Sequence, residues 1–212
     1  IQYSEKVYRF DVEAPLIAKS RKAGNFVIIR VDANSERMPL TIADADIEKG
    51  TITLVVQKVG LSSTKLCNLN EGDEIHDVVG PLGNPTHIEN YGTVLCAGGG
   101  VGVAPMLPII KALKAAGNRV LSVIAGRSKD LVIMEDEVRE SSDELIIMTD
   151  DGSYGEKGVV TVGMEKLIKQ EHIDKAFAIG PPIMMKFCCL LTQKYNLPTD
   201  VSLNTIMVDG TG

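Results

Sequence analysis

The hydrophobic rhythm of the chain changes near residue 90, and this change constrains the fold more than any other feature. Before it, β-branched and aliphatic runs such as 26–31 and 51–56 are separated by polar turns that contain glycine. After Tyr91 and Gly92, short apolar runs alternate with amphipathic stretches. The first pattern predicts a small antiparallel β-barrel or sandwich. The second predicts an α/β domain whose parallel sheet is covered by helices on both faces.

We therefore predict two domains, spanning residues 1–90 and 91–201, followed by a tail at residues 202–212. In the second domain a proline in the first turn marks the start of the last helix, and Gly117 closes the first helix. The strands expected there cover residues 93–96, 119–125, 144–148 and 175–179, and the helices cover 103–116, 131–140, 161–171 and 182–195.

Composition excludes several classes of protein. The 212 residues are 44% hydrophobic and 24% charged, which is typical of a globular protein. A net charge of −6 argues against a nucleic-acid partner, which would require a basic surface. No apolar run approaches the roughly 20 residues that span a bilayer. We expect no membrane span and, because the cysteines are expected to be reduced, a cytoplasmic location.

The four cysteines are not arranged as metal ligands. None belongs to a C-x-x-C pair, so the chain holds no complete zinc site or iron–sulfur loop. Cys96 ends an apolar run, and Cys188 shares the helical spacing i, i+3, i+4, i+7 with Met184, Phe187 and Leu191. We expect both thiols to lie in the core.

A glycine-rich segment, Gly98-Gly99-Gly100-Val101-Gly102-Val103-Ala104-Pro105, lies between a predicted strand and a predicted helix. Glycines let backbone N–H groups approach a ligand closely, and the start of a helix attracts anions, so a pyrophosphate is the expected occupant. The spacing differs from G-x-G-x-x-G because Val103 replaces the third glycine, and the Lys-Ser/Thr ending of NTPase loops is absent. The alternative is a tight turn without a ligand.

The segment G-G-G-V-G-V-A-P resembles the nicotinamide-binding loop of the ferredoxin–NADP reductase superfamily. Gly180-Pro181-Pro182-Ile183-Met184-Met185 resembles its second nicotinamide motif, Cys-Gly-Pro-x-x-Met, with Ile179 in the cysteine position. A strand end followed by a proline-initiated helix explains Gly-Pro-Pro equally well. The resemblance implies that NAD(P) is bound by Gly98, Gly99, Gly100, Gly102, Val103, Ala104, Pro105, Arg127, Asp150, Gly180, Pro181 and Met184.

The first half contains two segments that resemble the flavin motifs of the same superfamily. Arg37–Ile42 is similar to Arg-x-Pro/Tyr-x-Ser/Thr, in which arginine holds a phosphate and the hydroxyl of Thr41 would lie near flavin N5. Gly60–Thr64 is similar to the segment that opens a short helix over the pyrophosphate. A surface arginine and an ordinary helix cap are the alternatives. The implied FAD ligands are Arg37, Met38, Pro39, Leu40, Thr41, Gly60, Ser62, Ser63 and Thr64.

The segments 126–130 and 149–155 look typical of one branch of the superfamily. This branch contains the electron-transfer subunit of dihydroorotate dehydrogenase, an enzyme of pyrimidine biosynthesis, and the small subunit of NADH-dependent ferredoxin–NADP oxidoreductase. Arg127 could reach the adenosine ribose, but the residues leave NAD and NADP open. A plain acidic turn would also explain 149–155. In this branch a cysteine-rich loop with a [2Fe–2S] cluster follows, and we expect it after Val208–Gly212.

The expected function is hydride transfer between NAD(P)H and FAD, followed by single-electron transfer to an iron–sulfur centre and a catalytic or electron-accepting partner subunit. The nicotinamide is expected to stack on the flavin ring, and no side chain is expected to act as an essential acid or base. Two alternatives remain at this point. One is a stand-alone reductase of ferredoxin or flavodoxin, and the other is a non-enzymatic nucleotide sensor.

Overall fold

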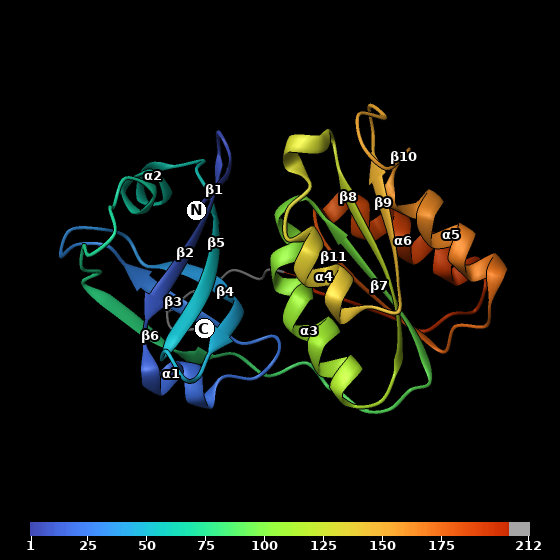
Figure 1. The fold of residues 1–212 in the computed structure, drawn as a ribbon, viewed down its shortest axis with the longest axis horizontal. Coiled ribbons are helices and arrows are strands. Elements are labelled where there is room, and N and C mark those ends of the chain that lie inside the picture. Colours follow the sequence, from blue (N-terminus) through green and yellow to red (C-terminus); the bar gives the residue numbers. More distant parts are fainter. Residues whose placement is uncertain (204–212) are drawn as a thin grey trace. The chain divides into compact units, whose positions relative to one another are not determined.

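The computed structural model describes residues 1–203, so Val208–Gly212 and the iron–sulfur loop expected after them lie outside the described part. The chain divides after Thr86 into two compact units, which are described separately. Figure 1 shows that the first consists mainly of β-strands and that the second alternates strands and helices. This arrangement confirms the predicted two-domain fold class.

The first unit is built on a six-stranded sheet in the order β1-β2-β5-β4-β3-β6, with antiparallel pairing throughout. The runs predicted at 26–31 and 51–56 form β3 and β5. Strand β4 pairs with β3 through its first half and with β5 through its second, where the register shifts at a bulge. The elements are β1 (Gln2–Ser4), β2 (Val7–Glu13), α1 (Pro15–Ser20), β3 (Phe26–Arg30), β4 (Met38–Asp46), β5 (Thr51–Gln57), α2 (Leu61–Cys67) and β6 (Asp77–Leu82).

The core of this unit lies between the strands and α1. Ile29, Ile42, Ile52 and Leu54 are fully buried on β3, β4 and β5, and Ile17 of α1 packs with them. A second buried cluster joins β5 to α2. Aliphatic and β-branched side chains of this kind fit a pleated surface that is buried on one face. The helix α1 was not expected from the sequence.

The second unit contains a parallel sheet in the order β10-β9-β8-β7-β11-β12. Helices α3 and α4 pack together on one face, and α5 and α6 pack together on the other (Figure 1). The elements are β7 (Thr93–Gly99), the 3-10 turn η1 (Gly100–Gly102), α3 (Val103–Ala115), β8 (Arg119–Gly126), η2 (Lys129–Leu131), α4 (Glu135–Ser141), β9 (Glu144–Thr149), β10 (Glu156–Lys157), α5 (Val160–Gln170), β11 (Lys175–Ile179), α6 (Pro182–Lys194) and β12 (Thr199–Val201).

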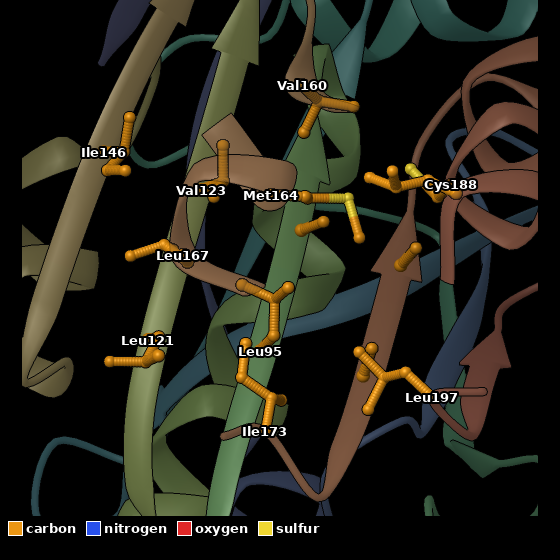
Figure 2. Close-up of a cluster of buried hydrophobic side chains, with 14 of the residues drawn as sticks. Leu95, Leu121, Val123, Ile146, Val160, Met164, Leu167, Ile173, Cys188 and Leu197 are labelled. Atoms are coloured by element: carbon orange, nitrogen blue, oxygen red, sulfur yellow. The ribbon is translucent and has the colours of Figure 1, made fainter. Parts of the chain in front are cut away.

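Strand side chains pack against α5 and α6 in the core of this unit. Figure 2 shows Leu95, Val123 and Ile146 facing Met164 of α5, with Cys188 of α6 beside them. Cys188 is fully buried and Cys96 is 1% exposed, so the prediction that both thiols are core residues is confirmed. Within the described part, no helix combines the length and apolarity that crossing a bilayer requires.

Phe187, which shares the predicted helical stripe of Cys188, does not lie in the core, because its side chain is 54% exposed. The buried face of α6 contains Met185, Cys188 and Leu191. At about 100° per residue, Phe187 lies roughly a third of a turn away from the centre of that face. The i, i+3, i+4, i+7 spacing correctly identified a helix. The face that packs on the core, however, is centred closer to Met185 than the predicted stripe is.

The helix predicted at residues 131–140 begins later, at Glu135. Met134 adopts a left-handed conformation with φ 55°, and Val132 is extended, so neither residue can continue a right-handed helix. Ile133 and Met134 are nevertheless buried. These apolar side chains hold the connection that leads into α4 against the core. In the sequence, they look like the start of the apolar stripe of a helix.

Candidate functional site

The predicted nicotinamide segments meet at one edge of the parallel sheet. The strands β7, β8, β9 and β11 are neighbours that run in the same direction, so their carboxyl ends share this edge. In the register, Gly98 lies opposite Ile179, and Gly126 lies opposite Thr149. The loops that follow these strands contain the glycine segment, Arg127, Asp150 and the Gly-Pro-Pro segment.

The two glycine motifs follow adjacent strands at the point where the strand order reverses. From β7 the chain moves outward through β8, β9 and β10, and it then returns to place β11 on the other side of β7. Open α/β sheets bind ligands in the crevice outside the carboxyl ends of strands at such a switch point. The topology therefore places both motifs where this fold accommodates a ligand.

The backbone of Gly102 packs directly against the end of β11. A Cβ atom on Gly102 would lie 2.5 Å from the carbonyl oxygen of Ile179 and 2.8 Å from the Cα of Gly180. Gly102 has an ordinary φ of −65°, so close approach, rather than conformation, explains why glycine is needed here. The first glycine motif is thereby joined to the second by backbone contact.

Met184 fills the space between the two motifs. Its thioether lies against Gly99 and against Gly180, and any Cβ on Gly99 would collide with its sulfur. Pro181 also borders this position. Because Met184 is only half-buried, it forms part of the exposed lining at the sheet edge. The second motif thus supplies both a turn and a wall beside the glycine segment.

The start of α3 can receive an anion. Gly102 occupies the N-cap position, no side chain of the described residues caps it, and the first turn contains no acidic residue. The backbone N–H groups of a first helical turn have no partner within the helix itself. In α3 the N–H of Val103 already donates to the carbonyl of Gly100 in η1, and Pro105 has no N–H, so this turn offers fewer donors than a regular helix start. The side chains of Val103 and Ala104 are buried, so they can contribute only their backbone. A Cβ on Gly100 would meet no atom within 4 Å, so the turn faces open space.

The loops after β8 and β9 are bound to each other. The N–H of Asp150 donates to the carbonyl of Gly126 (3.1 Å), and the N–H of Asp151 donates to that of Arg127 (3.2 Å). Lys129 places its ammonium 5.2 Å from the ring centroid of Tyr154. The side chains of Arg127 and Asp150 remain exposed. This pairing holds both predicted contacts of the adenosine end in one ordered surface.

In the first unit, the Arg37–Thr41 segment presents alternate residues to opposite sides. Met38 and Leu40 pack against the buried cluster that joins β5 to α2. Arg37 and Pro39 are exposed and Thr41 is half-buried, as the period of two along a strand requires. Only the second set can offer side chains to a cofactor, whereas Met38 and Leu40 can contribute backbone atoms.

The Gly60–Thr64 segment opens α2, as the motif predicts. Gly60 is the N-cap, and a Cβ placed on it would meet nothing within 4 Å. Ser63 is buried, and its hydroxyl accepts hydrogen bonds from the N–H groups of Val59 (3.0 Å) and Gly60 (2.9 Å). Its hydrogen-bonding capacity is therefore used by the loop itself. Ser62 and Thr64 are half-buried and have no such contacts among the described residues.

An ion pair joins residues that flank the two flavin-like segments of the first unit. Lys65 of α2 reaches the connection that precedes Arg37, where its ammonium lies 2.9 Å from Asp32 and 3.3 Å from the hydroxyl of Ser35. Hydrogen bonds from Lys65, Ser35 and the N–H of Asn34 lower the pKa of Asp32 to about 2. Sequence reasoning missed this link, because nothing in the chain marks residues 33 positions apart as partners.

The cysteines do not provide reactive groups at the sheet edge. Burial raises the pKa of Cys96 far above its ordinary value, and it raises that of Cys188 to about 12. Ile179, in the position where the superfamily motif has cysteine, is a buried residue at the end of β11. In the described part of the chain, no group of three or more histidine, cysteine or acidic side chains could hold a metal ion.

No family model matches this chain. A protein of Thermotoga maritima, "dihydroorotate dehydrogenase B (NAD(+)), electron transfer subunit homolog", is 51% identical over 212 residues, covering 100% of this chain and 75% of the relative. The electron-transfer subunit from Streptococcus pneumoniae is 33% identical, covering 85% and 71%. The chain belongs to the dihydroorotate dehydrogenase B electron-transfer subunit family.

Solved structures agree with this family. The structure reported for NADH-dependent reduced ferredoxin–NADP oxidoreductase, in work on flavin-based electron bifurcation, matches with a TM-score of 0.93 and 50% identity, covering 100% of this chain and 76% of that one. The cytochrome b5 reductase domain of Ulva prolifera nitrate reductase shares the fold at 19% identity (TM-score 0.72). The family, the fold class and the function class, an oxidoreductase electron-transfer subunit, are confirmed.

Proposed function

We propose that this chain binds FAD through its first unit and NAD(H) through its second, and that it transfers hydride between them. The observation that carries the proposal is the contact of the two glycine motifs at the β7/β11 switch point, where Gly102 abuts Gly180 and Met184 lies against Gly99. A close backbone junction next to an uncapped helix start suits a dinucleotide.

At the sheet edge, the glycine loop and the start of α3 bind the pyrophosphate through the backbone N–H groups that η1 does not use. Gly99 and Gly180 have no side chains that would obstruct the ligand. Met184 and Pro181 border the nicotinamide end. The exposed guanidinium of Arg127 and the neighbouring Asp150 contact the adenosine end. We favour NAD(H) over NADP(H), because the related electron-transfer subunits are named for NAD(+).

In the first unit, Arg37 holds a phosphate oxygen of FAD with its planar fork of donors, and the Thr41 hydroxyl faces the flavin N5 edge. Arg37 suits this role because it forms no ion pair with any residue that the structure describes, and its side chain is exposed. The remaining FAD contacts are the backbone of Gly60, which faces open space, and the hydroxyls of Ser62 and Thr64. Ser63 fixes the loop rather than contacting the ligand.

The bound cofactors supply the redox chemistry, with hydride passing between NADH and FAD and electrons leaving FAD singly. The chain's own residues bind and position the cofactors, and no side chain serves as an essential acid or base. The electrons pass to a [2Fe–2S] centre that we place in the full-length protein, and from there to a catalytic partner subunit. Four free cysteines support a reducing, cytoplasmic location.

An anaerobic visible spectrum of the full-length protein, purified and reconstituted with FAD, tests this proposal. We expect a flavin band that NADH bleaches at least ten times faster than NADPH does. A protein that binds NADH but retains no flavin would be a nucleotide sensor. A protein that reduces ferredoxin rapidly without a partner subunit would be a stand-alone reductase. Either result would overturn the proposal.

A further inference from the structure

Helix α6 carries two separate apolar stripes. One stripe, which contains Met185, Cys188 and Leu191, is buried against the sheet. The other contains Ile183, Phe187 and Leu190, at spacing i, i+4, i+7, and these side chains are 61%, 54% and 44% exposed. Residues at this spacing lie on one face of a helix. The structure therefore leaves a second apolar face of α6 without a partner among the described residues.

This face borders a groove between α5 and α6 with a volume of about 530 Å³. Val162, which is 50% exposed, lies on the α5 side. Contiguous apolar surface of this kind is uncommon on monomeric proteins and marks interaction sites. No lining residue belongs to the nucleotide motifs, so the groove is independent of the proposed function. The groove is lined by Thr161, Val162, Glu165, Phe187, Leu190, Leu191, Gln193 and Lys194.

The two helices that border the groove carry a net charge opposite in sign to that of the whole protein. Helix α5 has two lysines and one glutamate, and α6 has two lysines and no acidic residue, so the two helices carry a net charge of +3. The whole chain carries −6. Within the groove lining the charges of Glu165 and Lys194 balance, and Lys166 pairs with Glu156, so the unpaired positive charge lies on α6. This charge provides a basis for selecting a partner.

The acidic group in the groove is already neutralised. Glu165 pairs with Lys169 (3.1 Å) and accepts a hydrogen bond from the hydroxyl of Tyr195 (2.9 Å). Lys186 and Lys194 of α6 form no ion pair with any described residue. The charge that remains open beside the exposed apolar stripe is therefore positive.

We propose that the groove binds an amphipathic helix of a partner protein, with an apolar stripe flanked by aspartate or glutamate. The apolar side chains would lie on Phe187 and Leu190, and the carboxylates would meet Lys186 and Lys194, in the helix-in-groove mode of recognition. A second copy of this chain is a poorer occupant, because it would bring two more lysines against these two.

Two synthetic peptides test the proposal. Both are about 18 residues long, sufficient for appreciable helicity, and carry the same leucine stripe, flanked by glutamate in one and by lysine in the other. Binding to the full-length protein is measured by fluorescence anisotropy. We expect the acidic peptide to bind at least tenfold more tightly and to weaken as salt is raised. Equal binding of the two peptides, or binding of neither, would overturn the proposal.

Two variants locate the binding surface. Phe187→Ser is expected to reduce acidic-peptide affinity at least tenfold, and Lys194→Glu is expected to reverse the preference between the peptides. Val79→Ser, at a residue of β6 that is 52% exposed, is the matched control and should bind as the wild type does. Thermal melts verify that each variant is folded. If sedimentation shows a dimer that Phe187→Ser abolishes, the occupant is a second copy and the proposal is wrong.

Discussion

The thioether of Met184 occupies the space that a side chain on Gly99 would need. Although far apart in the sequence, these two residues form the contact that joins the candidate nucleotide-binding motifs. Glycine is required at position 99 because the side chain of Met184 fills the adjacent space. Each residue therefore limits which side chains can replace the other. This relationship gives a direct way to test the geometry of the sheet edge.

Gly99→Ala should destabilise the protein, because its methyl group must displace Met184, an overpacking that costs about 1–3 kcal/mol. Adding Met184→Ala to this variant should remove the collision. The double variant is therefore expected to be more stable than the two single effects imply, by about 0.5–3 kcal/mol for residues in contact. Urea unfolding of the four proteins measures this coupling. Strictly additive effects would show that the two residues do not touch.

Gly102→Ala should be damaging for a different reason. The new methyl group would meet backbone atoms of Ile179 and Gly180, which cannot move aside as a flexible side chain can. We expect a loss of roughly 1–3 kcal/mol of stability or more and weaker NADH binding, measured by thermal melting and fluorescence titration. Val101→Ala is the control, since Val101 is an exposed residue of the same turn. Similar behaviour of the two variants would contradict the contact.

The pair between Asp32 and Lys65 should make stability depend on acid pH. The folded-state pKa of Asp32 is lowered to about 2, below the value near 4 of an unfolded chain. A depressed pKa stabilises the fold at pH values above the unfolded pKa, and this contribution is lost as the pH falls from about 4 to about 2. Asp32→Asn should remove it. Denaturant unfolding at pH 5 and pH 3 should therefore show a smaller loss for the variant than for the wild type.

Arg37→Ala should release flavin. A hydrogen bond to a charged group is worth about 1.5–3 kcal/mol, so FAD retention should weaken by about tenfold or more, as measured by the flavin-to-protein absorbance ratio after gel filtration. Arg37→Lys keeps the charge but loses the planar guanidinium with its paired N–H donors, and it should retain an intermediate amount of flavin. Wild-type flavin content in Arg37→Ala would remove this residue from the proposed site.

The cysteines should react in the order of their exposure. Cys189 is the only partly exposed thiol, whereas Cys67, Cys96 and Cys188 are buried and burial raises the pKa of each. Because the thiolate is the reactive form, iodoacetamide at pH 8 should label Cys189 first and leave Cys96 and Cys188 until urea is added. Mass spectrometry of tryptic peptides follows each site. Early labelling of Cys96 would contradict the burial of β7.

The fold could be predicted because its main signal is local. Runs of valine and isoleucine fixed the strand positions, and the change of rhythm after Tyr91 separated an antiparallel sheet from a parallel one. The helix start at Glu135 could not be predicted, because the left-handed backbone of Met134 depends on where its side chain is buried. In α6 the sequence offers two apolar stripes, and only the sheet decides which one faces the core.

The sequence could also predict that the candidate nicotinamide segments lie at one edge of the sheet, because every one of them follows a predicted parallel strand. The partners of single side chains could not. Ser63 has the hydroxyl that an anion site needs, yet the loop uses it for its own N–H groups. Lys65 directly follows the predicted flavin segment, but its partner Asp32 is set by the packing of α2 beside β4.

The strand order also determines when the candidate nucleotide site can exist during synthesis. The glycine loop after β7 is made early, but the residues that abut it, Gly180 and Met184, come from β11 and α6, after β8, β9 and β10. A nascent chain that ends before Lys175 contains the glycine loop but lacks the residues of β11 and α6 that pack against it. Since chains emerge from the ribosome N-terminus first, the candidate site can form only once nearly all of the second unit has been translated and β11 has taken its place beside β7.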